Sequence, residues 1–224
     1  MRLTIPIIIA LLLVAGLAQA ADVPTSKGDK AMVFMFHGLC DLDLGPYGGG
    51  FGMRYYLADE LAVRGALVFD MYSETDEPSS SADPDRPDDE YSWNDMGLHI
   101  VIEKHLEGCG SSVSPYIGGG GGFNMYSEED KEAASWVDGT TTKWGQDICT
   151  YDATYFSLYG VAGFEWAFTD CLTLGGEYMF GFESWSGEEE TDYAEPGVDT
   201  WKSGKDSMSW IGFDTAHLYL SVYW

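Results

Sequence analysis

Five charged residues are the best candidates for joint chemistry, because two arginines and two glutamates among them stand at matched spacings. Arg54 and Arg64 lie at equal distances from Asp59, and two glutamates lie at equal distances from Cys171. If each centre is a tight turn between two strands, the arginines become cross-strand neighbours, and like charges in that position need acidic partners. We expect an inward-facing network, since desolvated charges require pairing. Its members are Arg54, Arg64, Glu103, Glu165 and Glu177. The alternative is that these carboxylates form an ion path or a catalytic site.

The histidines are scattered, and none suggests a second reactive centre. They are His37, His99, His105 and His217. Their spacing matches no metal-binding motif, and none stands in the close arrangement with a serine that hydrolases need. We therefore expect no catalytic residue, no metal centre and no cofactor.

Acidic residues dominate the charge, which is formally -26 at pH 7. This argues against nucleic acid as a partner. The acids cluster in residues 73–91, 127–152 and 184–206, which are predicted to be loops because they contain Pro, Ser and Gly and show little apolar periodicity.

Dense carboxylates on loops either keep the surface solvated or bind divalent cations such as calcium, or bridge through them to lipopolysaccharide phosphates. The weak calcium candidates are Asp83, Asp85, Asp88, Asp89, Glu188, Glu189 and Glu190, which show no EF-hand spacing. Tryptophans in or beside the loops are candidate partner contacts or part of a membrane-surface aromatic girdle. They are Trp136, Trp144, Trp185 and Trp201.

The first twenty residues have the composition of a secretory signal peptide. Arg2 precedes an apolar run over residues 5–17, and Ala18-Gln19-Ala20 forms a small-x-small cleavage signal. The alternative, a membrane-anchoring helix, needs a longer apolar stretch. We expect a signal peptide at residues 1–20 and a single domain at residues 21–224.

Alternating apolar and polar residues predict eight strands after the signal, and no segment has a helical period. They are residues 29–39, 47–57, 61–72, 91–106, 114–126, 154–168, 172–184 and 208–224. In the sixth strand Phe156, Leu158 and Phe164 share one face, and Glu165 lies on the other. An apolar face outside and charges inside suit a barrel in lipid. The predicted fold is all-β, an eight-stranded antiparallel up-and-down transmembrane β-barrel.

The connections alternate between short turns and long acidic segments, apart from a short first connection, as in bacterial outer-membrane barrels. With an even strand count, both termini are expected on the periplasmic side and the long loops outside the cell. The last seven residues alternate in a final strand and end in Tyr223 and Trp224, which we interpret as an assembly signal.

Three segments resemble the small eight-stranded outer-membrane barrels of the OmpA/OmpX type. They are Leu220-Ser221-Val222-Tyr223-Trp224, Gly48 to Leu57 (GGGFGMRYYL) and Leu61-Ala62-Val63-Arg64-Gly65. The resemblance covers the mature chain and implies a bacterial outer-membrane location. Members of that family serve as structural anchors, adhesins, evasion factors or, in a minority, lipid-modifying enzymes.

The resemblance implies a non-enzymatic structural or surface-interaction role. The expected partners are outer-membrane lipids and lipopolysaccharide, the outer-membrane assembly machinery and, through the loops, an extracellular protein or divalent cation. Three alternatives stay open: a narrow porin for small solutes, a lipid-modifying outer-membrane enzyme, and a soluble lipocalin-type barrel with phenylalanines such as Phe156, Phe164 and Phe180 inside.

Four cysteines in an exported chain suggest disulfides. The predicted topology places Cys40 and Cys149 outside the membrane and Cys109 and Cys171 in periplasmic turns. The barrel wall would separate the two groups by about 25 Å, beyond the ~7 Å reach of a disulfide. We therefore predict Cys40–Cys149 and Cys109–Cys171 bridges, the alternative being that either pair remains as free thiols.

Overall fold

The computed structural model describes residues 22–37, 47–76, 86–106, 112–213 and 217–224, and its regular elements there are all strands. The described residues contain no helix that is long and apolar enough to cross a membrane. The strands are β1 (Lys30–His37), β2 (Tyr47–Ala58), β3 (Leu61–Asp76), β4 (Asp89–His105), β5 (Val113–Asp138), β6 (Thr141–Thr169), β7 (Leu172–Asp192), β8 (Trp201–Lys202), β9 (Asp206–Phe213) and β10 (His217–Tyr223).

Antiparallel pairing joins β1 through β7 in chain order, and β10 closes the ring because it pairs with both β1 and β7. The closed ring therefore has eight strands over the described ranges. Strand β9 pairs with the stretch of β7 that follows the one paired with β10. Together β9 and β10 occupy the place of the predicted eighth strand. The predicted eight-stranded antiparallel barrel is confirmed.

Side chains alternate between the inside and the outside of this ring as the sequence pattern predicted. On β6, Phe156, Leu158 and Phe164 point outward and are 48%, 53% and 52% exposed, whereas Val161 and Glu165 are buried. The same alternation holds on β3, β4 and β7. The large apolar side chains lie on the outer surface, which is the reverse of a water-soluble barrel. The alternative of a lipocalin-type interior with phenylalanines inside is wrong.

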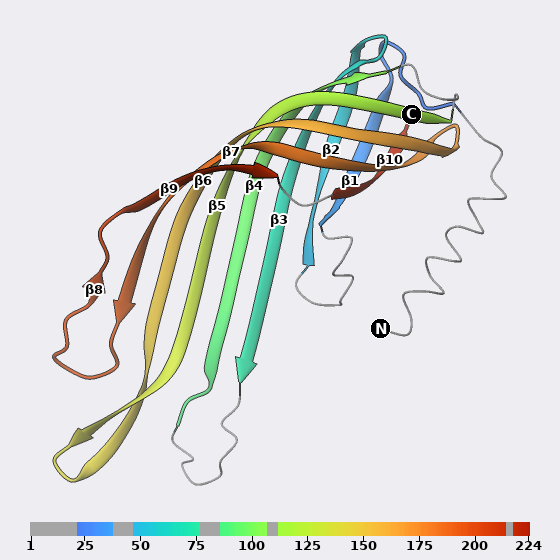
Figure 1. Ribbon diagram of the computed structural model, residues 1–224. Coiled ribbons are helices and arrows are strands. Elements are labelled where there is room, and N and C mark those ends of the chain that lie inside the picture. Colours follow the sequence, from blue (N-terminus) through green and yellow to red (C-terminus); the bar gives the residue numbers. More distant parts are fainter. Residues whose placement is uncertain (1–21, 38–46, 77–85, 107–111, 214–216) are drawn as a thin grey trace.

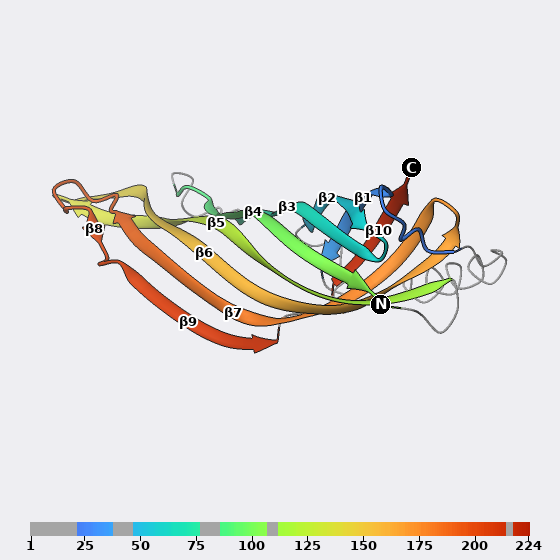
Figure 2. The same cartoon turned by 90° about the horizontal axis from the view of Figure 1, so that it is seen from above.

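The predicted acidic loop at residues 127–152 is almost entirely strand, and about half of residues 184–206 is strand as well, so the expectation of loops is corrected there. Strands β5 and β6 pair without a break from Val113 opposite Trp166 to Asp138 opposite Thr141, so residues 127–152 form a hairpin. Strand β7 likewise runs on to Asp192. Polar side chains on both faces hide the period of two that marks a strand in the sequence. The strands β4 to β7 extend well beyond β1, β2 and β10 as a curved sheet (Figures 1 and 2).

The short turns, the C-terminal strand and the segment before β1 meet at the opposite end of the barrel. The Tyr223 amide donates to the carbonyl of Cys171 at 2.8 Å, and the Glu60 amide donates to the carbonyl of Thr25 at 2.7 Å. The Trp224 amide donates to the carbonyl of Lys30 at 3.1 Å. The predicted signal peptide lies outside the described residues.

The turn between β5 and β6 depends on Gly139, whose φ is +65°. A β-branched residue there costs about 1–2 kcal/mol, so Gly139→Val should speed hydrogen exchange of the amides near the tip of the hairpin. Gly204→Val is the matched control, because a Cβ at Gly204 would meet no heavy atom and its φ lies outside the left-handed region. Equal exchange in the two variants would contradict the hairpin.

Candidate functional site

A buried ion-pair network fills the barrel between β2, β3, β4, β6 and β7, and it contains all five residues predicted for it. Arg54 contacts Glu103 (Nε to Oε2, 2.7 Å) and Glu165 (Nη1 to Oε1, 2.6 Å). Arg64 contacts Glu103 (Nε to Oε1, 2.7 Å) and Glu177 (Nη2 to Oε2, 2.6 Å). Every one of these side chains is 2% exposed or less. The network therefore stands across the lumen, sealed from solvent.

Glu103 lies at the centre of the network, because its carboxylate neutralises two like charges that face each other. Arg54 and Arg64 are directly opposite each other on β2 and β3. Like charges in that position destabilise a sheet. The neighbouring strand β4 brings Glu103 between them, and each of its oxygens meets one guanidinium group.

Tyrosines add further hydrogen bonds to the network. Tyr223 receives a bond from Arg54 Nη1 at 3.1 Å and donates to both oxygens of Glu165 at 3.1 Å. Tyr116 donates to Glu177 at 2.8 Å, and Tyr219 donates to Tyr116 at 2.9 Å. Of the two residues predicted as an assembly signal, Tyr223 thus faces the interior, whereas Trp224 is 62% exposed.

Two details of the sequence prediction need correction here. The β6–β7 pairing contains a bulge between Ala167 and Thr169, and beyond it the register is centred on Asp170 and not on Cys171, so Glu165 lies opposite Gly175 and not opposite Glu177. Spacing in the chain also indicated no close histidine and serine, yet His105 Nδ1 lies 2.9 Å from Ser114 Oγ. Both side chains are buried within the network, which gives a substrate no access.

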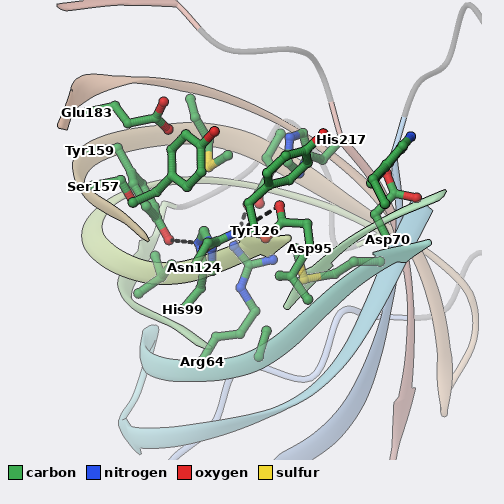
Figure 3. Close-up of a pocket in the computed structure, with 18 residues that line it drawn as sticks. Arg64, Asp70, Asp95, His99, Asn124, Tyr126, Ser157, Tyr159, Glu183 and His217 are labelled. Atoms are coloured by element: carbon green, nitrogen blue, oxygen red, sulfur yellow. Dashed lines mark hydrogen bonds and ion pairs between the residues drawn. The ribbon is translucent and has the colours of Figure 1, made fainter. Parts of the chain in front are cut away.

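On the far side of Arg64 and Glu177 from Arg54, the lumen widens into a cavity of about 410 Å³, which we call the chamber (Figure 3). Arg64 and Glu177 form its floor, and its other charged or aromatic lining residues are Asp70, Trp93, Asp95, His99, Tyr126, Tyr155, Tyr159, Glu183 and His217. The chamber was not predicted from the sequence, although the residues that line it lie at inward-facing positions of their strands.

A chain of hydrogen bonds fixes one carboxylate in the chamber. Asn124 Nδ2 lies 3.1 Å from both oxygens of Asp95 and donates to them, which leaves Asn124 Oδ1 to accept from His99 Nε2 at 2.9 Å. His99 Nδ1 then accepts from the hydroxyl of Tyr159 at 2.8 Å. A Cβ at Gly97 would lie 2.3 Å from Asn124 Oδ1, so this glycine makes room for the chain.

Aromatic side chains form a continuous row on the concave face of the sheet, which we call the aromatic row. Its members are Tyr72, Trp93, Tyr126, Tyr155 and Trp185, one from each strand from β3 to β7, with successive ring centroids 6.4, 6.0, 6.4 and 6.5 Å apart. Trp93, Tyr126 and Tyr155 also line the chamber. Trp185, predicted as a partner contact or girdle residue, therefore faces inward.

The calcium candidates that the structure describes do not converge. Glu188, Glu189 and Glu190 are consecutive on β7, so neighbouring side chains point to opposite faces. Asp89 accepts from Arg86 Nη2 at 2.8 Å. Within the described ranges, no group of three or more His, Cys, Asp or Glu residues could hold a metal ion. Asp88 is described, whereas Asp83 and Asp85 lie outside those ranges.

Neither predicted disulfide is present on the cysteines that the structure describes. Cys149 and Cys171 are free thiols, whereas Cys40 and Cys109 lie outside the described residues. Cys149 Sγ lies 3.4 Å from Glu189 Oε1, and partial burial raises the pKa of this thiol. Each predicted bridge has one cysteine outside the described residues, so the Cys40–Cys149 and Cys109–Cys171 pairings stay predictions.

The chain is similar to known proteins among solved structures. No protein-family model matches the chain, and no curated protein matches it. A major outer membrane protein from Thermus thermophilus is similar at 14% identity and a TM-score of 0.49, covering 88% of this chain and 99% of that one. OprG from Pseudomonas aeruginosa is similar at 9% identity and a TM-score of 0.46, covering 89% and 97%.

Ail, the attachment invasion locus protein of Yersinia pestis, is similar at 13% identity and a TM-score of 0.35, covering 88% of this chain and 99% of its own. These structural neighbours are small outer membrane proteins. Since every one of these TM-scores is below 0.5, the fold assignment rests on the closed strand ring itself. The chain is a small eight-stranded β-barrel.

Removing the charge of Glu103 should destabilise this barrel strongly. Glu103→Gln leaves two buried guanidinium groups without their shared partner, and breaking a buried ion pair in this way costs about 3–5 kcal/mol. The control is Glu60→Gln, which breaks the exposed pair with Lys104 and should cost about 1 kcal/mol or less. Urea unfolding in detergent or lipid measures both, and equal losses would remove the network as a source of stability.

Proposed function

We propose that this barrel resides in the bacterial outer membrane and has a non-enzymatic structural or surface-interaction role. The observation that carries the proposal is the combination of an apolar outer surface with an interior closed by four buried ion pairs. A barrel with its charges inside and its apolar side chains outside is suited to lipid. In this proposal the outer surface of the barrel contacts membrane lipids and lipopolysaccharide.

The long strands supply the surface for interaction. Strands β5 and β6 continue past the ring as a paired hairpin that ends at Gly139, and acidic side chains recur along it. In the proposed orientation this hairpin stands outside the cell, and the short turns and both termini face the periplasm. An extracellular protein or a surface of positive charge is the kind of partner that such an acidic projection suits.

A narrow porin is the less favoured alternative. A channel needs a continuous lumen, and Arg54, Arg64 and their three glutamates are buried as ion pairs beneath the chamber. Small barrels of this strand number are wide enough for side chains to fill. A lipid-modifying enzyme is also less favoured, because His105 and Ser114, which lie within hydrogen-bonding distance of each other, are buried.

The orientation is tested by epitope insertion in cells. A short epitope between Gly139 and Thr140 should bind antibody on intact cells, because the hairpin tip projects outward. The matched insertion after Asp170, in the short turn between β6 and β7, should bind only after the outer membrane is permeabilised. The reverse pattern, or recovery of the protein in the soluble periplasmic fraction, would overturn the proposal.

The lipid-facing surface is tested by a pair of arginine substitutions. Leu158 and Val137 are both outward and exposed, at 53% and 71%. Leu158→Arg should cost about 2–4 kcal/mol of stability in lipid vesicles if it lies near the middle of the bilayer. Val137→Arg, at the tip of the hairpin, should have little effect because it stays in water. Equal costs, measured by urea unfolding in vesicles, would contradict the assignment of Leu158 to lipid.

A further inference from the structure

One part of the chamber wall brings aromatic rings and polar groups side by side. Trp93 and Asp95 occupy successive inward positions on β4, Asn124 and Tyr126 do so on β5, and Tyr155 lies on β6. Tyr126 is opposite Asp95 and Tyr155 is opposite Asn124, so the five side chains are neighbours on three adjacent strands. All five are half-buried and line the chamber. We call these five residues the wall patch.

Several polar groups of the wall have unused hydrogen-bonding capacity. Asp95 accepts from Asn124 Nδ2 at 3.1 Å on each oxygen, which leaves lone pairs on both oxygens of its carboxylate. Among the described residues, the indole Nε1 of Trp93 and the hydroxyl of Tyr155 have no hydrogen-bond partner, and neither has the hydroxyl of Ser157, which also lines the chamber. The wall therefore offers donors and acceptors together.

This mixture favours a neutral ligand with several hydroxyl groups. A hydroxyl both donates and accepts, so it can bond to a carboxylate, an indole N–H or a phenol, whereas an ammonium group only donates and a carboxylate only accepts. An anionic ligand is disfavoured further by the charge of the lining, because one guanidinium group stands there against four carboxylates. These groups belong to Arg64, and to Asp70, Asp95, Glu177 and Glu183.

The aromatic rings select among ligands of this kind. Trp93, Tyr126 and Tyr155 are successive members of the aromatic row, with centroids 6.0 and 6.4 Å apart. They provide rigid apolar area beside the polar groups of the patch. A pyranose has C–H groups on its faces and hydroxyls around its edge, so it can contact both at once, whereas a linear polyol has no apolar face. The volume of about 410 Å³ is within the range of small-molecule sites.

Asp95 is also held in place before any ligand arrives. The hydrogen-bond chain from Tyr159 through His99 and Asn124 reaches both of its oxygens. Figure 3 shows these side chains converging beside the carboxylate of Asp95. A fixed acceptor binds a hydroxyl without the cost of ordering its own side chain.

We propose that the chamber binds a neutral pyranose sugar, either free or as the terminal ring of a glycan. One hydroxyl of the sugar donates to Asp95, a face of the ring packs against Trp93 and Tyr126, and a second hydroxyl bonds to Tyr155. Binding requires the folded barrel but not a particular partner of the outer hairpin. The sugar site and the proposed surface role can therefore fail independently.

The test is saturation-transfer NMR of the full folded chain in a phosphocholine detergent, which contains no sugar. The probes are glucose, galactose, mannose and N-acetylglucosamine, each as the free sugar and as its methyl glycosides. At least one should bind. Binding of a methyl glycoside assigns the site to the terminal ring of a glycan, and binding of the free form alone assigns it to a free sugar. No binding of any probe up to about 20 mM, where even millimolar affinity is detected, would overturn the proposal.

Two further ligands test the chemistry of recognition. Tetrahydropyran-2-methanol keeps the ring but lacks the ring hydroxyls, and it should not bind. Glucuronate adds a negative charge and should bind more weakly than the best neutral sugar. Binding of either ligand as tight as that of the best neutral sugar would overturn the proposal.

Asp95→Asn keeps the shape of the side chain and removes its charge. It should weaken binding of the best neutral sugar by about tenfold, within the range expected for a hydrogen bond to a charged group. Asp170→Asn is the control, since it removes one charge from an exposed turn outside the lining of the chamber. Unchanged affinity in Asp95→Asn, or an equal loss in the control, would contradict the site.

Trp93→Leu tests the contact with the ring face. It should weaken sugar binding by about threefold to tenfold, as expected for loss of one aromatic contact. Trp201→Leu is the matched control, because Trp201 is 48% exposed and does not line the chamber. Equal affinity in the two variants would contradict the assigned contact.

Tyr155→Phe separates ligand binding from a structural role. The lost hydroxyl bonds to no other described residue, so the melting temperature should match that of the parent. Sugar affinity should nevertheless fall by about threefold to tenfold, the loss expected for one neutral hydrogen bond. Parent affinity in this variant would contradict the proposed position of the sugar. A boiled and unboiled gel confirms that each variant is folded before titration.

Discussion

The interior of this barrel depends on how two arginines are accommodated on adjacent strands. The β2–β3 turn places Arg54 opposite Arg64, and burial leaves neither guanidinium in contact with water. Such a pair is tolerable only if anions reach it from several directions. Strand β4 supplies Glu103, and β6 and β7 supply Glu165 and Glu177. Five strands must therefore be in register before the interior is neutralised, so ring closure and charge pairing require each other.

The same requirement explains which parts of the molecule can be derived from sequence. Arg54 and Arg64 pair symmetrically about Asp59, as their spacing predicts, and this turn also contains a register shift, between Tyr56 and Ala58. Glu165 and Glu177 do not pair with each other, because the β6–β7 register is centred on Asp170 and not on Cys171, and the residue types do not reveal where a turn is centred. The inward parity of each residue survives this shift, which is why the network members were predictable while their exact neighbours were not.

The outer half of the barrel shows the limit of the hydrophobic pattern. Residues 127–152 carry polar side chains on both faces, so a strand and a loop look alike in the sequence. Backbone pairing between β5 and β6 nevertheless continues to Gly139. The chamber was missed for a related reason. Asp70, Asp95 and the aromatic row lie far apart in the chain, and only the closed ring brings them to one cavity.

The paired hairpin of β5 and β6 fixes the positions of the acidic side chains at the far end of the barrel. In a flexible acidic loop the carboxylates would have no fixed positions relative to one another. A strand instead holds alternate side chains on one face at steps of about 6.8 Å. One face of the hairpin therefore carries an evenly spaced row of carboxylates, from Glu128, Asp130 and Glu132. Under the proposed surface role, a partner with cationic groups at a matching interval would bind this face better than one with the same total charge at another interval.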